Sequence, residues 1–187
     1  MILGITGTIG AGKGAVVEYL RTKHQFVHLS ARDFITNEIT KRGLPINRDT
    51  MTEIANLLRQ EHGSSFIVEE LYRQADRDGR NVVIESIRTE GELTFLRKQK
   101  NFSLLAIDSE QKLRYQRVLE RKSSTDNISF AKFRDDEARE AESDDPNKQN
   151  INFCIKNADF VIRNNGSFED LHTEIEKILE HLSARTQ

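Results

Sequence analysis

The chain has 187 residues, of which 36% are hydrophobic and 31% charged, a composition typical of one globular domain with its own core. The formal net charge of −2 excludes an overall basic field of the kind that attracts nucleic acid or a membrane surface. Cys154 is the only cysteine, which excludes an internal disulfide, and its apolar neighbours predict a core thiol. No apolar run is long enough for a membrane span or a signal peptide, and we therefore expect a cytoplasmic protein.

A short apolar run at residues 2–6 predicts a buried strand, and a glycine-rich segment follows it directly. This segment has the spacing of a P-loop, or Walker A motif, and a helical pattern opens near its end. Glycines let backbone N–H groups approach a phosphate, the helix N-terminus adds positive potential, and the lysine supplies a charge for the β- and γ-phosphates. We expect ATP or a similar donor nucleotide to bind along this loop, through Gly7, Thr8, Ile9, Gly10, Ala11, Gly12, Lys13, Gly14 and Ala15.

The loop departs from the usual pattern at the position after the lysine. A Ser or Thr normally stands there and helps to hold Mg²⁺. In this chain Gly14 and then Ala15 follow Lys13, and neither has a hydroxyl group. We therefore expect Mg²⁺ to depend on phosphate oxygens, water and a carboxylate from elsewhere in the chain.

A second strand is predicted over residues 26–29, and the segment 30–79 that follows is too long for a simple crossover. Its pattern is largely helical, with breaks near Gly43 and Gly63. We interpret the segment as an insertion over one edge of the sheet. A mobile flap and a solvated pair of helices fit the sequence equally well.

The third predicted strand, at residues 82–85, ends on Glu85. In P-loop folds a carboxylate at this strand end lies beside the phosphate loop and can hold Mg²⁺ or its waters, although a solvent-facing glutamate is the alternative. Two further apolar runs, at 102–107 and 159–162, complete the set. Continuous apolar strands that alternate with helical patterns predict an α/β fold with a parallel sheet of about five strands.

A stripe of arginines at helical spacing and a polar stretch at 122–148 lie between the last two strands. The polar stretch is also too long for a simple crossover, and we interpret it as a second insertion over the sheet edge, again either a mobile flap or a solvated pair of helices. Arg121 stands at its start, and arginines that close over a transferring phosphoryl group stabilise its developing charge. Arg114 and Arg117 are assigned instead to a solvated helix face. Three arginines are favoured as catalytic residues of this lid: Arg121, Arg134 and Arg139.

The sequence Gly12-Lys13-Gly14 resembles adenylate kinase and related nucleoside monophosphate kinases, and the segment 28–35 is similar to the one that follows their second strand. In those enzymes a Ser or Thr and an Asp flank the acceptor site. The resemblance therefore implies that Ser30 and Asp33 bind the acceptor. Asp33 would orient the acceptor or act as a catalytic base, and an aspartate that merely favours the helix dipole is the alternative.

The same resemblance implies an arginine that grips the acceptor phosphate. The family places one shortly after the aspartate, where this chain has Thr36, and Arg32 is a possible substitute. Arg88, three residues after the third strand, is implied to bind the acceptor phosphate as a bidentate donor. A surface arginine is the alternative for Arg88.

The C-terminal segment 158–167 looks more like dephospho-CoA kinase, whose last strand and turn border the adenine pocket. This resemblance implies that Asn164 contributes to the donor nucleotide site. Dephospho-CoA kinase also carries an Asp-x-Asp, including its catalytic base, after its second strand. Ser30 and Arg32 occupy those positions here, which argues against the dephospho-CoA reaction itself.

Over its whole length the chain most resembles mainly archaeal nucleotide-kinase-like proteins related to both families. The resemblance implies a P-loop NTPase fold of three α/β/α layers in a single domain, 1–187, with an acceptor-binding insertion at about 30–79 and a lid at about 122–148. It rests on segments at 42–44, 84–88, 121–126 and 133–135.

The leading interpretation is a kinase that moves a phosphoryl group from ATP, with Mg²⁺, to a nucleoside or deoxynucleoside monophosphate. Its partners would be a nucleotide and a small acceptor, with no membrane and no nucleic acid. One alternative is phosphorylation of an alcohol, as in dephospho-CoA kinase. Another is a nucleotide-binding regulatory ATPase, which the missing hydroxyl after Lys13 and the displaced acceptor arginine both favour.

Overall fold

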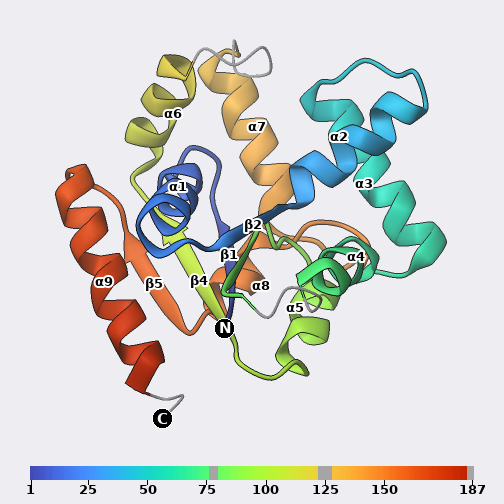
Figure 1. The fold of residues 1–187 in the computed structure, drawn as a ribbon. Coiled ribbons are helices and arrows are strands. Elements are labelled where there is room, and N and C mark those ends of the chain that lie inside the picture. Colours follow the sequence, from blue (N-terminus) through green and yellow to red (C-terminus); the bar gives the residue numbers. More distant parts are fainter. Residues whose placement is uncertain (76–79, 122–127, 185–187) are drawn as a thin grey trace.

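The computed structural model describes residues 1–75, 80–121 and 128–184. A five-stranded sheet in the order β2-β3-β1-β4-β5 forms the centre of the molecule, and every neighbouring pair is parallel (Figure 1). The predicted parallel α/β fold is therefore confirmed, with each strand within one residue of its expected bounds. The strands are β1 (Ile2–Gly7), β2 (Val27–Ser30), β3 (Val82–Glu85), β4 (Phe102–Asp108) and β5 (Phe160–Arg163).

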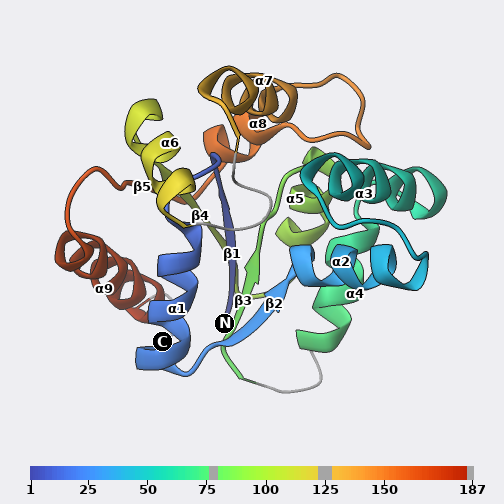
Figure 2. The same ribbon diagram turned by 90° about the horizontal axis from the view of Figure 1, so that it is seen from above.

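Helices cover both faces of the sheet, which gives three layers (Figure 2). On one face, α1 (Lys13–His24) and α9 (Phe168–Ala184) bury an apolar cluster that includes Leu3 and Ile5 of β1. On the other face, α4 (Phe66–Ala75), α5 (Glu90–Arg97) and α8 (Ile151–Lys156) cover β3 and β4. Strands that are buried on both sides need apolar residues at successive positions, which explains their continuous apolar runs.

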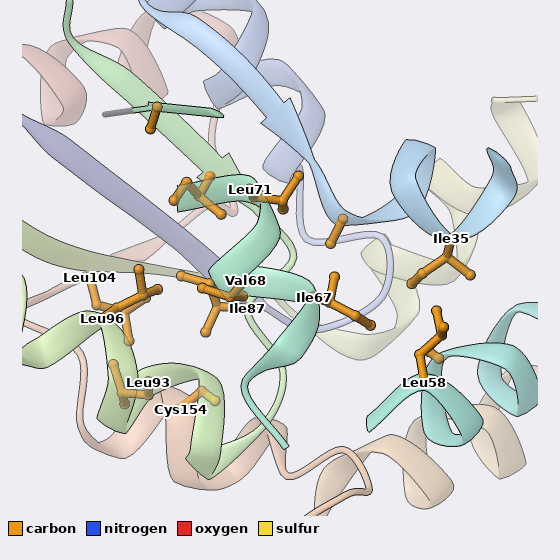
Figure 3. Close-up of a cluster of buried hydrophobic side chains, with 14 of the residues drawn as sticks. Ile35, Leu58, Ile67, Val68, Leu71, Ile87, Leu93, Leu96, Leu104 and Cys154 are labelled. Carbon is orange, nitrogen blue, oxygen red and sulfur yellow. The ribbon is translucent and has the colours of Figure 1, made fainter. Parts of the chain in front are cut away.

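The predicted helical insertion after β2 is formed by α2 (Ala31–Lys41), α3 (Arg48–His62) and α4. The interruptions fall where the sequence predicts them, because Gly43 and Gly63 stand just beyond the ends of α2 and α3 and both have positive φ. Ile35 of α2 and Leu58 of α3 are turned toward each other in the apolar cluster beneath these helices (Figure 3). Cys154 is fully buried in the same cluster, as expected, and burial raises the pKa of its thiol to about 12.

Helices α6 (Gln111–Glu120) and α7 (Phe130–Ala141) lie at the carboxyl edge of the sheet, across from α2 and α3 (Figure 1). Helix α7 begins at a Ser129 cap, whose hydroxyl accepts from the backbone N–H of Lys132. Residues 122–127 of the proposed lid, which include most of the matching segment at 121–126, lie outside the described residues. Within the described parts of the chain, no helix is both long and apolar enough to cross a membrane.

Candidate active site

The phosphate loop connects β1 to α1 and is held in one backbone conformation by close neighbours. Gly10 has φ of +77°, and a Cβ there would lie 2.4 Å from the carbonyl oxygen of Arg114. Gly12, the N-cap of α1, has φ of +104°, and a Cβ there would lie 2.3 Å from Nδ2 of Asn164. Both positions therefore require glycine for backbone conformation and for space.

Side chains from β4, α6 and the end of β5 form hydrogen bonds with the loop. Thr8 Oγ1 donates to Asp108 Oδ1 at 2.9 Å. Asn164 is buried, and its Nδ2 donates to the carbonyl oxygen of Ala11 at 2.8 Å. Asn164 therefore binds the loop directly, and it also lines the larger of the two cavities described below.

Arg114 and Arg117 do not form the solvated helix face that the sequence predicts, and that prediction is wrong. Arg114 is only 7% exposed, it pairs with Glu137, and its Nη1 donates to the carbonyl oxygen of Ile9 at 3.2 Å. Arg117 Nη1 donates to the carbonyl oxygen of Asn164 at 2.9 Å. Helix α6 packs against the loop, so its inward arginines satisfy loop and turn carbonyls that would otherwise lack a donor.

Lys13 lies at the start of α1, and its Nζ donates to the carbonyl oxygens of Gly7 and Thr8, each at 2.8 Å. Burial, together with the nearby positive charge of Arg88, lowers the pKa of Lys13 to about 7. Phosphate oxygens beside Nζ would favour the charged form and raise this pKa again.

A cavity of about 650 Å³ opens over the loop and the first turn of α1. Its wall includes the residues from Gly10 to Ala15, together with Arg117, Asn164 and Phe168. This volume lies within the range of roughly 300–1,000 Å³ that is usual for ligand pockets. The position over a glycine-rich loop and a helix N-terminus suits the phosphates of a nucleotide.

A second cavity, of about 160 Å³, lies between the loop and the helices α2 and α3. Arg32 and Arg88 line it. Its volume is below the roughly 300 Å³ at the lower end of ordinary ligand pockets, so it has room for only one end of a ligand. Four residues line both cavities, namely Gly10, Lys13, Glu85 and Arg121. The two cavities therefore meet at the lysine of the phosphate loop.

Glu85 ends β3 at this junction, and His28 Nε2 donates to its Oε2 at 3.1 Å. Burial alone would raise the pKa of Glu85, but the bond from His28 and the charge of Lys13 outweigh it and lower the pKa below its usual value. Glu85 is therefore a carboxylate at neutral pH. His28 was not predicted as a site residue from the sequence, although His28 and Ser30 share one face of β2 and Ser30 pairs with Glu85 in the register.

The single carboxylate of Glu85 suits a magnesium ion that is bound mainly by nucleotide phosphates. Mg²⁺ commonly uses one or two carboxylates, several waters and substrate phosphates rather than a cage of protein ligands. Among the described residues, no group of three or more His, Cys, Asp or Glu side chains is arranged to hold a metal ion. Glu85 is ionised and borders both cavities, so one carboxylate is available where the phosphates would meet.

Arg88 lines the second cavity and donates through Nη1 to Glu140 and, at 2.8 Å, to Gln149 Oε1. The residue two positions earlier, Ser86, has φ of +72° and also lines this cavity. Backbone strain of this kind concentrates at ligand sites, because only the surrounding structure keeps the residue there.

The remaining predicted site residues make other contacts. Ser30 Oγ accepts from the backbone N–H of Asp33 at 3.0 Å, so this pair caps α2. Arg139 donates to Asp49 Oδ1 at 2.9 Å, and Arg134 lines a third cavity behind the loop. The described residues that line the two joined cavities therefore exclude Ser30, Asp33, Arg134 and Arg139.

Arg59 lines the second cavity and was not predicted from the sequence. It is 2% exposed, and its Nε and Nη2 donate to Oε1 of Glu92 at 3.1 and 2.9 Å. The sequence does contain a signal, because Arg59 follows Ala55 by four residues and therefore lies on the buried face of α3. A buried arginine needs a partner, and the partner comes from α5, far away in sequence.

A family model described as an AAA domain matches residues 3–144. A UPF0200 protein of Methanocaldococcus jannaschii is 30% identical over 185 residues, which cover 97% of this chain and 90% of that protein.

Two solved structures share the fold. The protein TT1252 of Thermus thermophilus superposes with a TM-score of 0.63 over 97% of both chains, at 20% identity. A shikimate kinase of Aquifex aeolicus superposes with a TM-score of 0.57 over 96% of both chains, at 14% identity. At these identities the likeness shows a shared fold and no shared activity.

Proposed function

The chain belongs to a family of P-loop, kinase-like proteins, that of the AAA domain and the archaeal UPF0200 proteins, and from this membership we propose that it is a nucleotide kinase. In this proposal it transfers a phosphoryl group from ATP to a nucleoside or deoxynucleoside monophosphate. The observation that carries the proposal is the meeting of two cavities at Lys13. Phosphoryl transfer requires donor and acceptor to approach in line, and two cavities that share this lysine provide for that.

On the donor side, Lys13 and the loop N–H groups hold the β- and γ-phosphates. Glu85, held ionised by His28 and Lys13, is the carboxylate that would bind Mg²⁺ directly or through water. A bound Mg²⁺ would neutralise part of the negative charge on the phosphate oxygens. Asn164 and Arg117 hold the loop and the turn after β5 in position beside the donor nucleotide.

On the acceptor side, Arg88 and Arg32 bind the acceptor phosphate within the smaller cavity. Arg121 borders both cavities, whereas Arg134 and Arg139, the other two proposed lid arginines, line neither of them. The cavity takes the phosphate end of the acceptor, and we expect α2 and α3 to separate when a base and sugar enter. The segments at about 30–79 and 122–148 act in this proposal as the acceptor-binding insertion and the lid.

A monophosphate fits these residues better than an alcohol does. A phosphate acceptor is already an anion and needs no strong base, whereas an alcohol needs one to remove its proton. Asp33, the residue expected to be that base, is exposed and is not among the described residues that line the cavities. Cationic side chains at Lys13, Arg32 and Arg88 also favour an anionic acceptor.

The test is consumption of ATP with Mg²⁺ across ribonucleoside and deoxynucleoside monophosphates and dephospho-CoA, with mass spectrometry of the products. A diphosphate formed from one monophosphate is the expected result and names the acceptor. Phosphorylated dephospho-CoA would replace the proposal with alcohol phosphorylation. Hydrolysis of ATP without any phosphorylated acceptor would replace it with a regulatory ATPase.

A further inference from the structure

The acceptor cavity has a buried arginine whose hydrogen-bonding capacity is only partly used. Arg59 of α3 is 2% exposed and lines this cavity. Its Nε and Nη2 both donate to the same oxygen of Glu92. Its third nitrogen, Nη1, is buried and has no hydrogen-bond partner among the described residues. Buried guanidinium nitrogens are normally paired, so the unused Nη1 leaves hydrogen-bonding capacity for a group that enters the cavity.

Glu92 fixes the orientation of this arginine. Its second oxygen, Oε2, accepts from the backbone N–H groups of Arg88 at 2.8 Å and of Thr89 at 3.1 Å. The N-terminal turn of α5, the segment of Arg88 and the side chain of Arg59 are therefore joined through a single carboxylate. A planar guanidinium held on one edge keeps its remaining N–H groups in a fixed direction.

The charge of the cavity wall indicates what kind of ligand it takes. Six basic side chains line the cavity, namely Lys13, Arg32, Arg48, Arg59, Arg88 and Arg121. They stand against three carboxylates, the lining residues Glu85 and Glu140 and the buried Glu92 that pairs with Arg59. Such an excess of positive charge in a partly enclosed space favours a ligand that carries more than one negative charge. A phosphate monoester has this charge and offers oxygens that accept from guanidinium groups.

We propose that Arg59 binds the acceptor phosphate through Nη1, with Glu92 as its positioning residue. This inference rests on the proposed function and adds a third arginine, beside Arg88 and Arg32, to the acceptor site. Helix α3 packs against α2, and from there Arg59 reaches the cavity that both helices border.

The experiment measures binding of inorganic phosphate by ³¹P NMR, with a non-hydrolysable ATP analogue bound so that the phosphate loop is already occupied. The main variant is the double substitution Arg59→Gln with Glu92→Gln, which removes both charges and retains hydrogen-bonding groups. The matched control is Arg97→Gln with Asp159→Asn, an ion pair on the far end of α5 whose arginine is more exposed. Thermal unfolding and affinity for the ATP analogue are measured on each variant.

We expect the wild-type protein to bind phosphate in the presence of the analogue, and the Arg59/Glu92 variant to bind it about tenfold or more weakly. The control pair keeps wild-type affinity, and analogue binding is unchanged in all three proteins. If the double variant does not fold, Arg59→Lys decides the question, because it keeps the charge and loses the guanidinium fork, with an expected weakening of about threefold or more.

Equal phosphate affinity in the wild-type protein and the Arg59 variants would overturn the inference, and so would a wild-type protein that binds no phosphate beside the analogue. The outcome is separable from that of the kinase assay. Phosphate binding that depends on Arg59, without transfer to any monophosphate, would contradict the proposed function alone. Transfer with an acceptor KM that does not change in the Arg59 variants would contradict the role of Arg59 alone.

Discussion

The two sides of the candidate active site are built in different ways. The donor side is one continuous segment, in which nine residues from Gly7 to Ala15 present backbone groups and one lysine. The acceptor side is assembled from α2, α3, the segment after β3, and α7, and its side chains meet only because the chain folds. The residues of a site that uses backbone groups can therefore be adjacent in the sequence. The residues of a site that uses side chains can be far apart in the sequence.

The largest effect that tests this difference is expected at Glu92, on the acceptor side. Glu92→Ala leaves the buried guanidinium of Arg59 without its counter-charge and removes the capping box of α5. We expect the free energy of unfolding to fall by about 3–5 kcal/mol. Urea denaturation measures it, and Glu90→Ala, at an exposed position in the same first turn, is the control with almost no change. A loss below about 1 kcal/mol would mean that the pair does not hold the acceptor side together.

The next largest effect concerns the donor side. Lys13→Ala removes the charge placed for the β- and γ-phosphates, and we expect nucleotide turnover to fall by on the order of 10²–10³-fold. The fold should be retained, because Nζ bonds only to carbonyls of the loop itself among the described residues. Lys23→Ala, on the exposed surface of the same helix, provides the control. Unchanged turnover in Lys13→Ala would contradict the role of the phosphate loop.

A smaller effect separates backbone strain from loop function. Gly12→Ala and Gly43→Ala both place a side chain at positive φ, and each is expected to cost about 1–2 kcal/mol of stability. Gly43 has open space around its Cβ, whereas the Cβ of Gly12 would displace Asn164 from the loop. We therefore expect only Gly12→Ala to weaken binding of a fluorescent ATP analogue. Equal binding by the two variants would show that Asn164 does not set the loop conformation.

The smallest effect is a pH dependence of donor binding. The pKa of Lys13 is about 7 in the free protein, and phosphate oxygens would raise it in the complex. Binding above pH 7 must therefore take up a proton, so the affinity for ATP falls as the pH rises. From a free pKa near 7 we expect a loss of roughly fivefold between pH 7 and pH 8. Calorimetry in buffers of different ionisation enthalpy measures the proton uptake, and its absence would rule out a titrating Lys13.

The sequence predicts much of the fold and most of the donor side. The five strands, the loop and the breaks at Gly43 and Gly63 all depend on local patterns, and they are confirmed. Arg114 was misassigned because helical spacing does not reveal which face of α6 packs on the loop. Arg59 was missed because its partner, Glu92, stands 33 residues away and only the folded chain brings them together.

Binding of dinucleoside pentaphosphates tests most directly the central claim, that the donor and acceptor cavities meet at Lys13. The ligands are diadenosine pentaphosphate and its counterparts with guanosine, uridine or thymidine as the second nucleoside, and adenosine tetraphosphate is the donor-only reference. A ligand that spans both cavities should bind about 10²-fold or more tightly than the reference. Affinities no higher than that of adenosine tetraphosphate, across the whole set, would contradict the account.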